Sequence, residues 1–261
     1  MGTAWAARRL GFAAAMAVAL AMVIFGGQAL AAPLIPFSTA HPELSPSRPA
    51  RPDPQPVDLS SRGGSRSVPA DAAPAGGPAA KVGLQAGHWR ASEAGPPLSS
   101  QLGSSGRGKS EAEVNLPIAE AAAQILRAAG HSVDVLPTVI PRGYQADLVV
   151  AIHADGGPSS RRGFFVDTSP RQATASAEAK LARTLADAYS SVGIPYVFRG
   201  TAASRYYYGY YAVDPRTPMV LIETGFLTNP TDQLVLVDRP DLAGAGIARG
   251  ILDYLASRDS S

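Results

Sequence analysis

The feature that most constrains the fold of this sequence is an almost unbroken apolar run at residues 147–152, Asp-Leu-Val-Val-Ala-Ile. A run without polar alternation is typical of a strand buried on both faces, as in the interior of a parallel sheet. A second run with the same character, Pro-Met-Val-Leu-Ile, occupies residues 218–222. Strands of this kind must be covered on both sides, so the chain should also contain helices that pack on the sheet.

The remaining segments alternate between strand and helix patterns. Val114, Ile118 and Ile125 recur at helical spacing, and Leu181 and Leu185 do the same in a later segment. Further strands are expected at 81–86, 131–136 and 163–166, and helices at about 114–130, 173–192, from 229 or 230 onward, and 240–256. This alternation predicts an α/β fold, a single domain with a mostly parallel twisted sheet flanked by helices on both faces.

The start of the first helix has two interpretations. Pro117 is tolerated only near the beginning of a helix, which favours a start near Val114 and leaves Glu111 just before it. Alternatively, Ser110 and Glu113 have the spacing of a capping box, which would begin the helix at once after Ser110.

The N-terminal segment has the three parts of a secretory signal. Arg8 and Arg9 precede an apolar stretch at 10–25, and Ala29-Leu30-Ala31 resembles a cleavage site. We therefore interpret residues 1–31 as a signal peptide. The alternative is an uncleaved anchor, since residues 10–32 are just long enough to cross a bilayer. Either way we expect an exported protein, extracellular or in the cell wall or periplasm, with membrane contact only if this segment is retained.

Residues 32–79 are rich in Pro, Ser, Ala and Gly and predict a disordered linker ahead of a domain at 80–258. His41 lies in this linker and is discounted as a ligand. Residues 81–261 carry 17 Lys or Arg and 17 Asp or Glu, so the net charge of +2 comes from the first 80 residues. A neutral domain gives no support for nucleic-acid binding.

Polar side chains follow three of the predicted strands where each strand ends. His88, His153 and Glu223 come directly after apolar runs, and Glu111 lies near the start of the helix after the first strand. The carboxyl ends of parallel strands form one edge of a sheet, where ligands bind. The sequence has no cysteine, so a zinc site would have to use His and carboxylate ligands, as catalytic sites do. His131 opens its strand at the other edge and is interpreted as structural.

Around these residues the chain resembles the zinc-dependent N-acetylmuramoyl-L-alanine amidases of the amidase-3 type. The resemblance covers about 81–256 and rests on four blocks in the same order and spacing: VGLQAGH (82–88), SEAEVNLPIA (110–119), ADLVVAIHAD (146–155) and PMVLIETGFLTNPTD (218–232). By this resemblance one zinc ion is held by His88, Glu111 and His153, and Glu223 is the catalytic carboxylate. In the family the ligand lies four residues before the Asn of this block, which corresponds here to Asn115. The resemblance therefore implies Glu111 as the ligand and not Glu113, which lies two residues away.

The departures from the family pattern fall near the first ligand. Where relatives usually read LDPGHGG, this chain reads LQAGHWR. Gln85 thus replaces an acidic residue and Trp89-Arg90 replaces two glycines, which we expect to change the surroundings of His88. The TR-x-x-D segment after the second strand is also missing. Only about nine residues separate His153 from the next strand, which leaves no room for the autoinhibitory helix of some relatives.

The resemblance implies hydrolysis of the amide between the lactyl group of N-acetylmuramic acid and L-alanine in peptidoglycan, by a monomer. A zinc peptidase acting within the stem peptide and a non-catalytic peptidoglycan-binding relative are the alternatives. Arg216 is a candidate for contact with a substrate carboxylate. The tyrosine-rich run at 205–211 either lines a substrate groove, with Tyr211 as a contact, or is an ordinary β-rich segment with rings in the core; composition favours the second.

Overall fold

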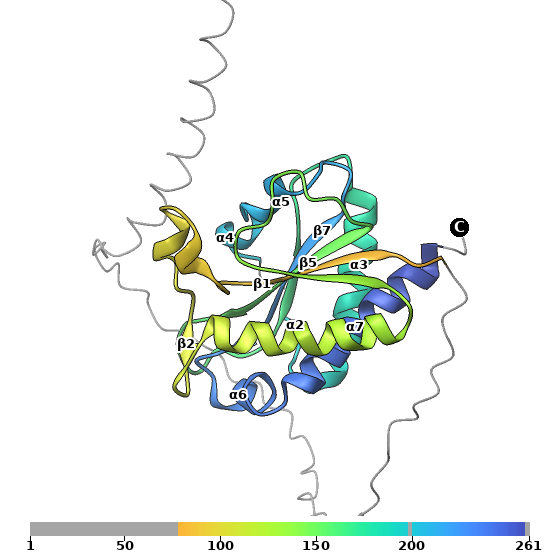
Figure 1. Cartoon of the computed structure of the whole chain (residues 1–261). Coiled ribbons are helices and arrows are strands. Elements are labelled where there is room, and N and C mark those ends of the chain that lie inside the picture. The colour runs from red at the N-terminus through yellow and green to blue at the C-terminus, as the bar shows by residue number, and fades with distance from the viewer. Residues whose placement is uncertain (1–77, 198–199, 259–261) are drawn as a thin grey trace, which may run out of the picture. The chain divides into compact units, whose positions relative to one another are not determined.

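The computed structural model describes residues 78–197 and 200–258, and a five-stranded sheet lies at the centre of this part of the chain (Figure 1). The strand order is β4-β1-β5-β7-β6, and all neighbours are parallel except β6 and β7, which are antiparallel. The strands are β1 (Lys81–Ala86), β4 (Ser132–Leu136), β5 (Leu148–Asp155), β6 (Phe165–Thr168) and β7 (Met219–Phe226). The apolar runs that predicted central strands are β5 and β7, so the mostly parallel α/β fold is confirmed.

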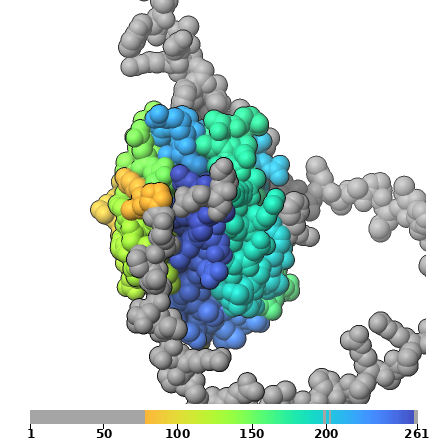
Figure 2. All heavy atoms as spheres, turned by 90° about the vertical axis from the view of Figure 1, so that its right-hand side faces the viewer, coloured from red at the N-terminus to blue at the C-terminus, as the bar shows by residue number. Residues whose placement is uncertain are grey.

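The three long helices lie together on one face of the sheet. They are α2 (Glu111–Ala128), α3 (Ala175–Tyr189) and α7 (Pro240–Arg258). Helix α7 lies between α2 and α3 (Figure 2). Glycines allow this close approach: a Cβ at Gly244 would lie 2.6 Å from the Cβ of Ala121, and one at Gly250 would lie 2.7 Å from the Cα of Leu185. The larger apolar core forms between these helices and the sheet.

A smaller core covers the opposite face and uses no long helix. It includes Val149, Ala151 and Leu221 from the sheet, and Tyr210 and Val213 from a later segment. That segment contains two short helices, α4 (Ala202–Arg205) and α5 (Gly209–Ala212). Helices therefore flank both faces as predicted, but unequally. The expectation of a β-rich tyrosine run was wrong, because these residues form helical turns that place Tyr210 in the core.

Helix α2 begins earlier than Val114. The Ser110 side chain and the backbone N–H of Ser110 both bond to Glu113, and these contacts belong to a capping box that starts the helix at Glu111. Pro117 consequently lies inside the helix, and the expected start near Val114 was wrong. The capping interactions and the buried face of α2 outweigh the preference of proline for the first turn.

The smaller elements lie in the connections between the strands and the long helices. A two-stranded hairpin, β2 (Ser105–Gly106) with β3 (Lys109–Ser110), precedes α2, and the 3-10 turns are Ala91–Glu93, Leu98–Ser100 and Ser190–Val192. Helix α6 (Pro230–Leu236) begins as predicted, with the Asn229 side chain accepting hydrogen bonds from the backbone of Thr231 and Asp232. No helix occurs between β5 and β6 in the described chain.

The predicted signal peptide and His41 lie outside the described residues, as does the predicted linker apart from its last two positions. Within the described part of the chain, no helix combines the length and apolar character needed to span a membrane.

Candidate metal centre

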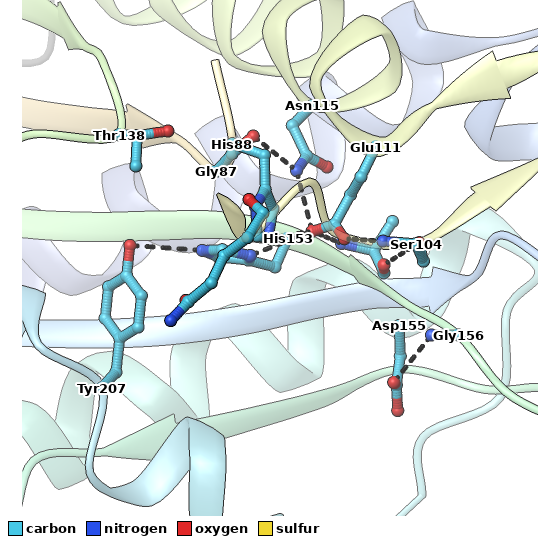
Figure 3. A network of polar contacts seen from close by, with 12 residues as sticks. Gly87, His88, Ser104, Glu111, Asn115, Thr138, His153, Asp155, Gly156 and Tyr207 are labelled. Atoms are coloured by element: carbon cyan, nitrogen blue, oxygen red, sulfur yellow. Dashed lines mark hydrogen bonds and ion pairs between the residues drawn. The ribbon is translucent and has the colours of Figure 1, made fainter. Parts of the chain in front are cut away.

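Three of the predicted site residues meet at the carboxyl edge of the sheet (Figure 3). His88 follows β1, Glu111 is the first residue of α2, and His153 lies in the last part of β5. One nitrogen or oxygen atom from each lies within 4.8 Å of the others. Glu111 Oε1 is 2.9 Å from His153 Nδ1 and 3.6 Å from His88 Nε2. The carboxylate therefore sits between the two imidazoles.

His88 is held by the backbone rather than by an acidic side chain. Its Nδ1 lies 2.7 Å from the carbonyl oxygen of Gln101, which makes Nδ1 the donor and leaves Nε2 facing Glu111. His88 adopts a φ of 60°, in the left-handed region that non-glycine residues rarely occupy. Gly103 packs directly on the site, since a Cβ there would lie 2.6 Å from His88 Cδ2 and 2.4 Å from Glu111 Oε2.

Glu111 is buried but well supplied with hydrogen-bond donors. Its Oε1 accepts from Asn115 Nδ2 at 3.2 Å and from the backbone N–H of Ala154 at 3.1 Å, and its Oε2 accepts from the N–H of Ser104 at 2.7 Å. Burial by itself would raise the pKa of Glu111, but the hydrogen bond and charge of His153, with that of His88, lower it below its usual value. The carboxylate is thus kept ionised, as a metal ligand must be.

The ring of His153 is enclosed on several sides. Its Nδ1 faces Glu111, and its Nε2 lies 3.3 Å from the hydroxyl of Tyr207 (Figure 3). The backbone of Gly87 lies against the ring, because a Cβ at this position would be 2.4 Å from His153 Cε1. The backbone carbonyl of His153 also accepts a hydrogen bond from Thr224 on β7.

Glu223 lies beside His153 on the neighbouring strand. The two residues are register partners in the parallel pair β5–β7, so their side chains leave the sheet on the same face. One carboxylate oxygen of Glu223, Oε2, is buried without a hydrogen-bond partner among the described residues. Burial raises the pKa of Glu223 well above its usual value, and the negative charges of Glu111, Asp155 and Asp167 raise it further.

The convergent atoms fit a zinc ion. Bonds of about 2.0–2.2 Å in a tetrahedral arrangement separate neighbouring ligand atoms by about 3.4 Å. The separations of 2.9 and 3.6 Å around Glu111 Oε1 lie on either side of this value. Two imidazole nitrogens and one carboxylate are also the donor types of catalytic zinc sites that keep a fourth position open.

The structure places the other candidate residues away from this group. Glu113 belongs to the capping box of α2, and the Nδ1 of His131 accepts from the backbone of Ala80 at the opposite sheet edge. Arg216 is 82% exposed and pairs with Asp214. Tyr211 is 63% exposed. Within residues 78–197 and 200–258, neither Arg216 nor Tyr211 forms a hydrogen bond or ion pair with His88, Glu111, His153 or Glu223.

The expected effect of Gln85 on His88 is not what the structure shows. Gln85 is fully buried and accepts a hydrogen bond from the hydroxyl of Tyr207 at 2.9 Å, so it contacts the surroundings of His153 instead. The side chain of Gln85 leaves β1 toward the smaller core, whereas His88 lies beyond the strand end. Sequence reasoning missed Tyr207, although the tyrosine-rich run was a signal that this segment is unusual.

A mostly parallel α/β sheet with a His-Glu-His group that can bind a metal ion, beside a half-buried glutamate with one unpartnered carboxylate oxygen, is the arrangement expected of a metal-assisted hydrolase. The model of the amidase-3 family, N-acetylmuramoyl-L-alanine amidase, matches residues 82–253. The chain therefore belongs to this family of hydrolytic amidases, whose substrate is peptidoglycan. A search of curated proteins gives no match.

Solved structures of amidases share the fold. The amidase Ami1 from Mycobacterium smegmatis is 21% identical, with a TM-score of 0.51 over 68% of this chain and 97% of that one. The CwlD amidase from Clostridioides difficile, solved in complex with the GerS lipoprotein, is 19% identical, with a TM-score of 0.51 over 68% of this chain and 99% of that one. At these identities the likeness demonstrates a common fold.

Proposed function

We propose that His88, Glu111 and His153 hold one zinc ion, and that Glu223 transfers the proton during hydrolysis of the amide between N-acetylmuramic acid and L-alanine. The observation that carries this proposal is the position of Glu223, which is the register partner of a residue in the His-Glu-His group. Zinc bound by such a group lowers the pKa of water toward 7 and polarises a carbonyl oxygen.

The residues of the chain have separate tasks in this mechanism. Glu223 Oε2 has no partner within the described protein and is free to accept the proton of the attacking water. The same carboxyl group then returns the proton to the nitrogen of L-alanine, so that the amine leaves in neutral form. Glu111 is saturated with hydrogen bonds and has no capacity for this role.

Glu223→Gln tests the assignment because it keeps the shape of the side chain and removes its basicity. We expect stem-peptide release from purified peptidoglycan to fall by about 10²- to 10⁴-fold, the usual contribution of general acid–base catalysis. Bound zinc should remain at one ion per chain. Glu113→Gln is the matched control, since glutamine also serves in a capping box and the activity should stay near that of the wild type. A Glu223→Gln protein with wild-type activity would refute the mechanism.

The same assay distinguishes the amidase from a peptidase acting within the stem. Amidase cleavage exposes the amino group of L-alanine, whereas a stem peptidase exposes that of a later residue. Arg216 and Tyr211 remain predictions for substrate contact, without an interaction in the structure that favours them.

We also propose that residues 1–31 direct export, that 32–79 form a linker to a monomeric catalytic domain at 80–258, and that the protein works in the cell wall or periplasm. The support is the charged, apolar and small-residue pattern of the N-terminus and the nature of the substrate. N-terminal sequencing of the mature protein would detect cleavage after Ala31, and an intact N-terminus in the membrane fraction would indicate an anchor instead.

A further inference from the structure

The two ring nitrogens of His153 face different groups. Nδ1 lies 2.9 Å from Glu111 Oε1, on the side of the metal-binding group, and Nε2 lies 3.3 Å from the hydroxyl of Tyr207 (Figure 3). A histidine that binds a metal through one nitrogen needs a hydrogen-bond acceptor for the N–H of the other. His88 has such an acceptor in the carbonyl oxygen of Gln101. For His153 the described structure offers the Tyr207 hydroxyl.

A tyrosine hydroxyl can donate as well as accept, so its direction must be fixed by other contacts. The Tyr207 hydroxyl donates to Gln85 Oε1 at 2.9 Å, the shortest of its contacts, because an amide oxygen can only accept. The Tyr208 hydroxyl, 3.2 Å from that of Tyr207, can serve as the donor in their contact. The amide of Gln85 is oriented in turn, because its Nε2 donates to the carbonyl oxygen of Thr138 and to the hydroxyl of Tyr208, both at 3.3 Å. With its single proton directed at Gln85, the Tyr207 oxygen presents a lone pair to His153.

Burial makes this arrangement effective. Gln85 has no exposed surface, and the rings of Tyr207 and His153 pack edge to face with centroids 5.2 Å apart. Water therefore competes poorly for the Nε2 proton, and hydrogen bonds in a chain of this kind strengthen one another.

We propose that Tyr207, oriented by Gln85, is a positioning residue that keeps a proton on Nε2 of His153 when Nδ1 binds zinc in place of the proton that it shares with Glu111. The inference rests on the proposed zinc site and deepens it. Tyr207 lies at the Nε2 edge of the ring, away from Glu111, so it acts through His153 and not on the reacting atoms. A buried glutamine and a half-buried tyrosine thus orient the histidine that would bind the metal.

The test compares the dissociation constants for zinc of single and double variants of the full chain, measured by chelator competition. Tyr207→Phe removes only the hydroxyl and should weaken zinc binding by about 10- to 100-fold, the usual effect of losing an outer partner. Gln85→Leu should weaken it in the same direction, and the double variant should be no weaker than Tyr207→Phe alone. Tyr206→Phe is the matched control, because Tyr206 is 60% exposed and its variant should bind like the wild type.

Two outcomes would overturn the inference: a Tyr207→Phe protein that binds zinc as tightly as the wild type, or losses from the two single variants that multiply in the double variant. His153→Ala separates this failure from that of the zinc site. If His153→Ala loses zinc while Tyr207→Phe does not, only the role of Tyr207 is wrong. If His153→Ala binds zinc normally, the proposed site fails and the inference fails with it.

A measurement on the wild type avoids dependence on the folding of any variant. Long-range nitrogen–proton NMR spectra of the zinc-loaded protein should show the His153 proton on Nε2, protected from exchange with solvent. A proton on Nδ1 of His153, or an Nε2 proton that exchanges as fast as that of a free imidazole, would contradict the proposal.

Discussion

At the scale of single residues, the space around His153 is the most restricted part of the site. The ring is bounded by Glu111 at one edge, Tyr207 at the other and the backbone of Gly87 at its face. A glycine is required at 87 because of this close approach and not because of its φ angle, which is not in the left-handed region.

Gly87→Ala should therefore displace the imidazole. The new methyl group would lie 2.4 Å from Cε1 and 2.6 Å from both ring nitrogens of His153, closer than van der Waals contact permits. We expect zinc binding to weaken by about 10-fold or more, while the circular dichroism spectrum stays that of the wild type.

Gly95→Ala is the control for this substitution, since a Cβ at Gly95 meets no atom within 4 Å. It should bind zinc normally. Equal affinities for the Gly87→Ala and Gly95→Ala proteins would show that His153 can move aside without loss of the site.

The sequence was more informative about the candidate metal ligands than about the residues that hold these ligands in position. His88, Glu111 and His153 could be selected because strand ends converge in a parallel sheet and because the family blocks fix the register. Tyr207 could not, because its position depends on how the tyrosine-rich run folds, and that run forms helical turns where its composition favours strands. The partner of Gln85 lies 122 residues away, a separation that no local pattern indicates.

At the scale of elements, Asp232 connects helix α6 with the residues just before β6 and with the end of β7. This fully buried carboxylate, in the first turn of α6, accepts hydrogen bonds from the backbone N–H groups of Gly163 and Phe226 at 2.9 and 3.1 Å. Arg162 Nε donates to it at 3.1 Å. Asp232 thus fixes the start of the β6 region and the end of β7, the strand that carries Glu223.

Asp232→Asn should destabilise the protein by about 2–4 kcal/mol, because an amide NH₂ would replace one accepting oxygen and leave buried donors unpaired. The free energy of unfolding from urea titration measures the effect. Asp253→Asn provides the comparison, since Asp253 forms only an exposed pair with Arg249 and its loss should change stability by less than about 0.5 kcal/mol. Similar stabilities for the two variants would contradict this account.

The predicted elements agree with the structure where a pattern has one physical cause, and differ where two causes compete. The unbroken apolar runs favoured buried strands, and they form β5 and β7. At the start of α2, the capping box favours a helix from Glu111 and Pro117 favours a later start. The helix begins at Glu111, as the capping box predicts. The hairpin at 105–110 has only two residues in each strand, too few for any periodicity to appear.

At the scale of the whole molecule, zinc should stabilise the fold because the three ligand residues come from separate segments. Only the folded chain brings His88, Glu111 and His153 together, so zinc binds the native state in preference to the unfolded one. Free zinc at 1,000 times its dissociation constant should add about 4 kcal/mol to the free energy of unfolding.

Thermal unfolding with a chelator and with graded zinc measures this linkage. The melting temperature should rise with zinc for the wild type and remain unchanged for His153→Ala. A wild-type protein whose melting temperature does not respond to zinc would contradict the proposed site.

The hydrogen bonds around Glu111 have a consequence for the order in which the enzyme is assembled. A buried carboxylate usually depends on a nearby cation, but this one already has donors from Ser104, Asn115 and Ala154, besides His153. These donors should let the domain fold without zinc, so the chelated protein should keep the far-UV circular dichroism spectrum of the wild type.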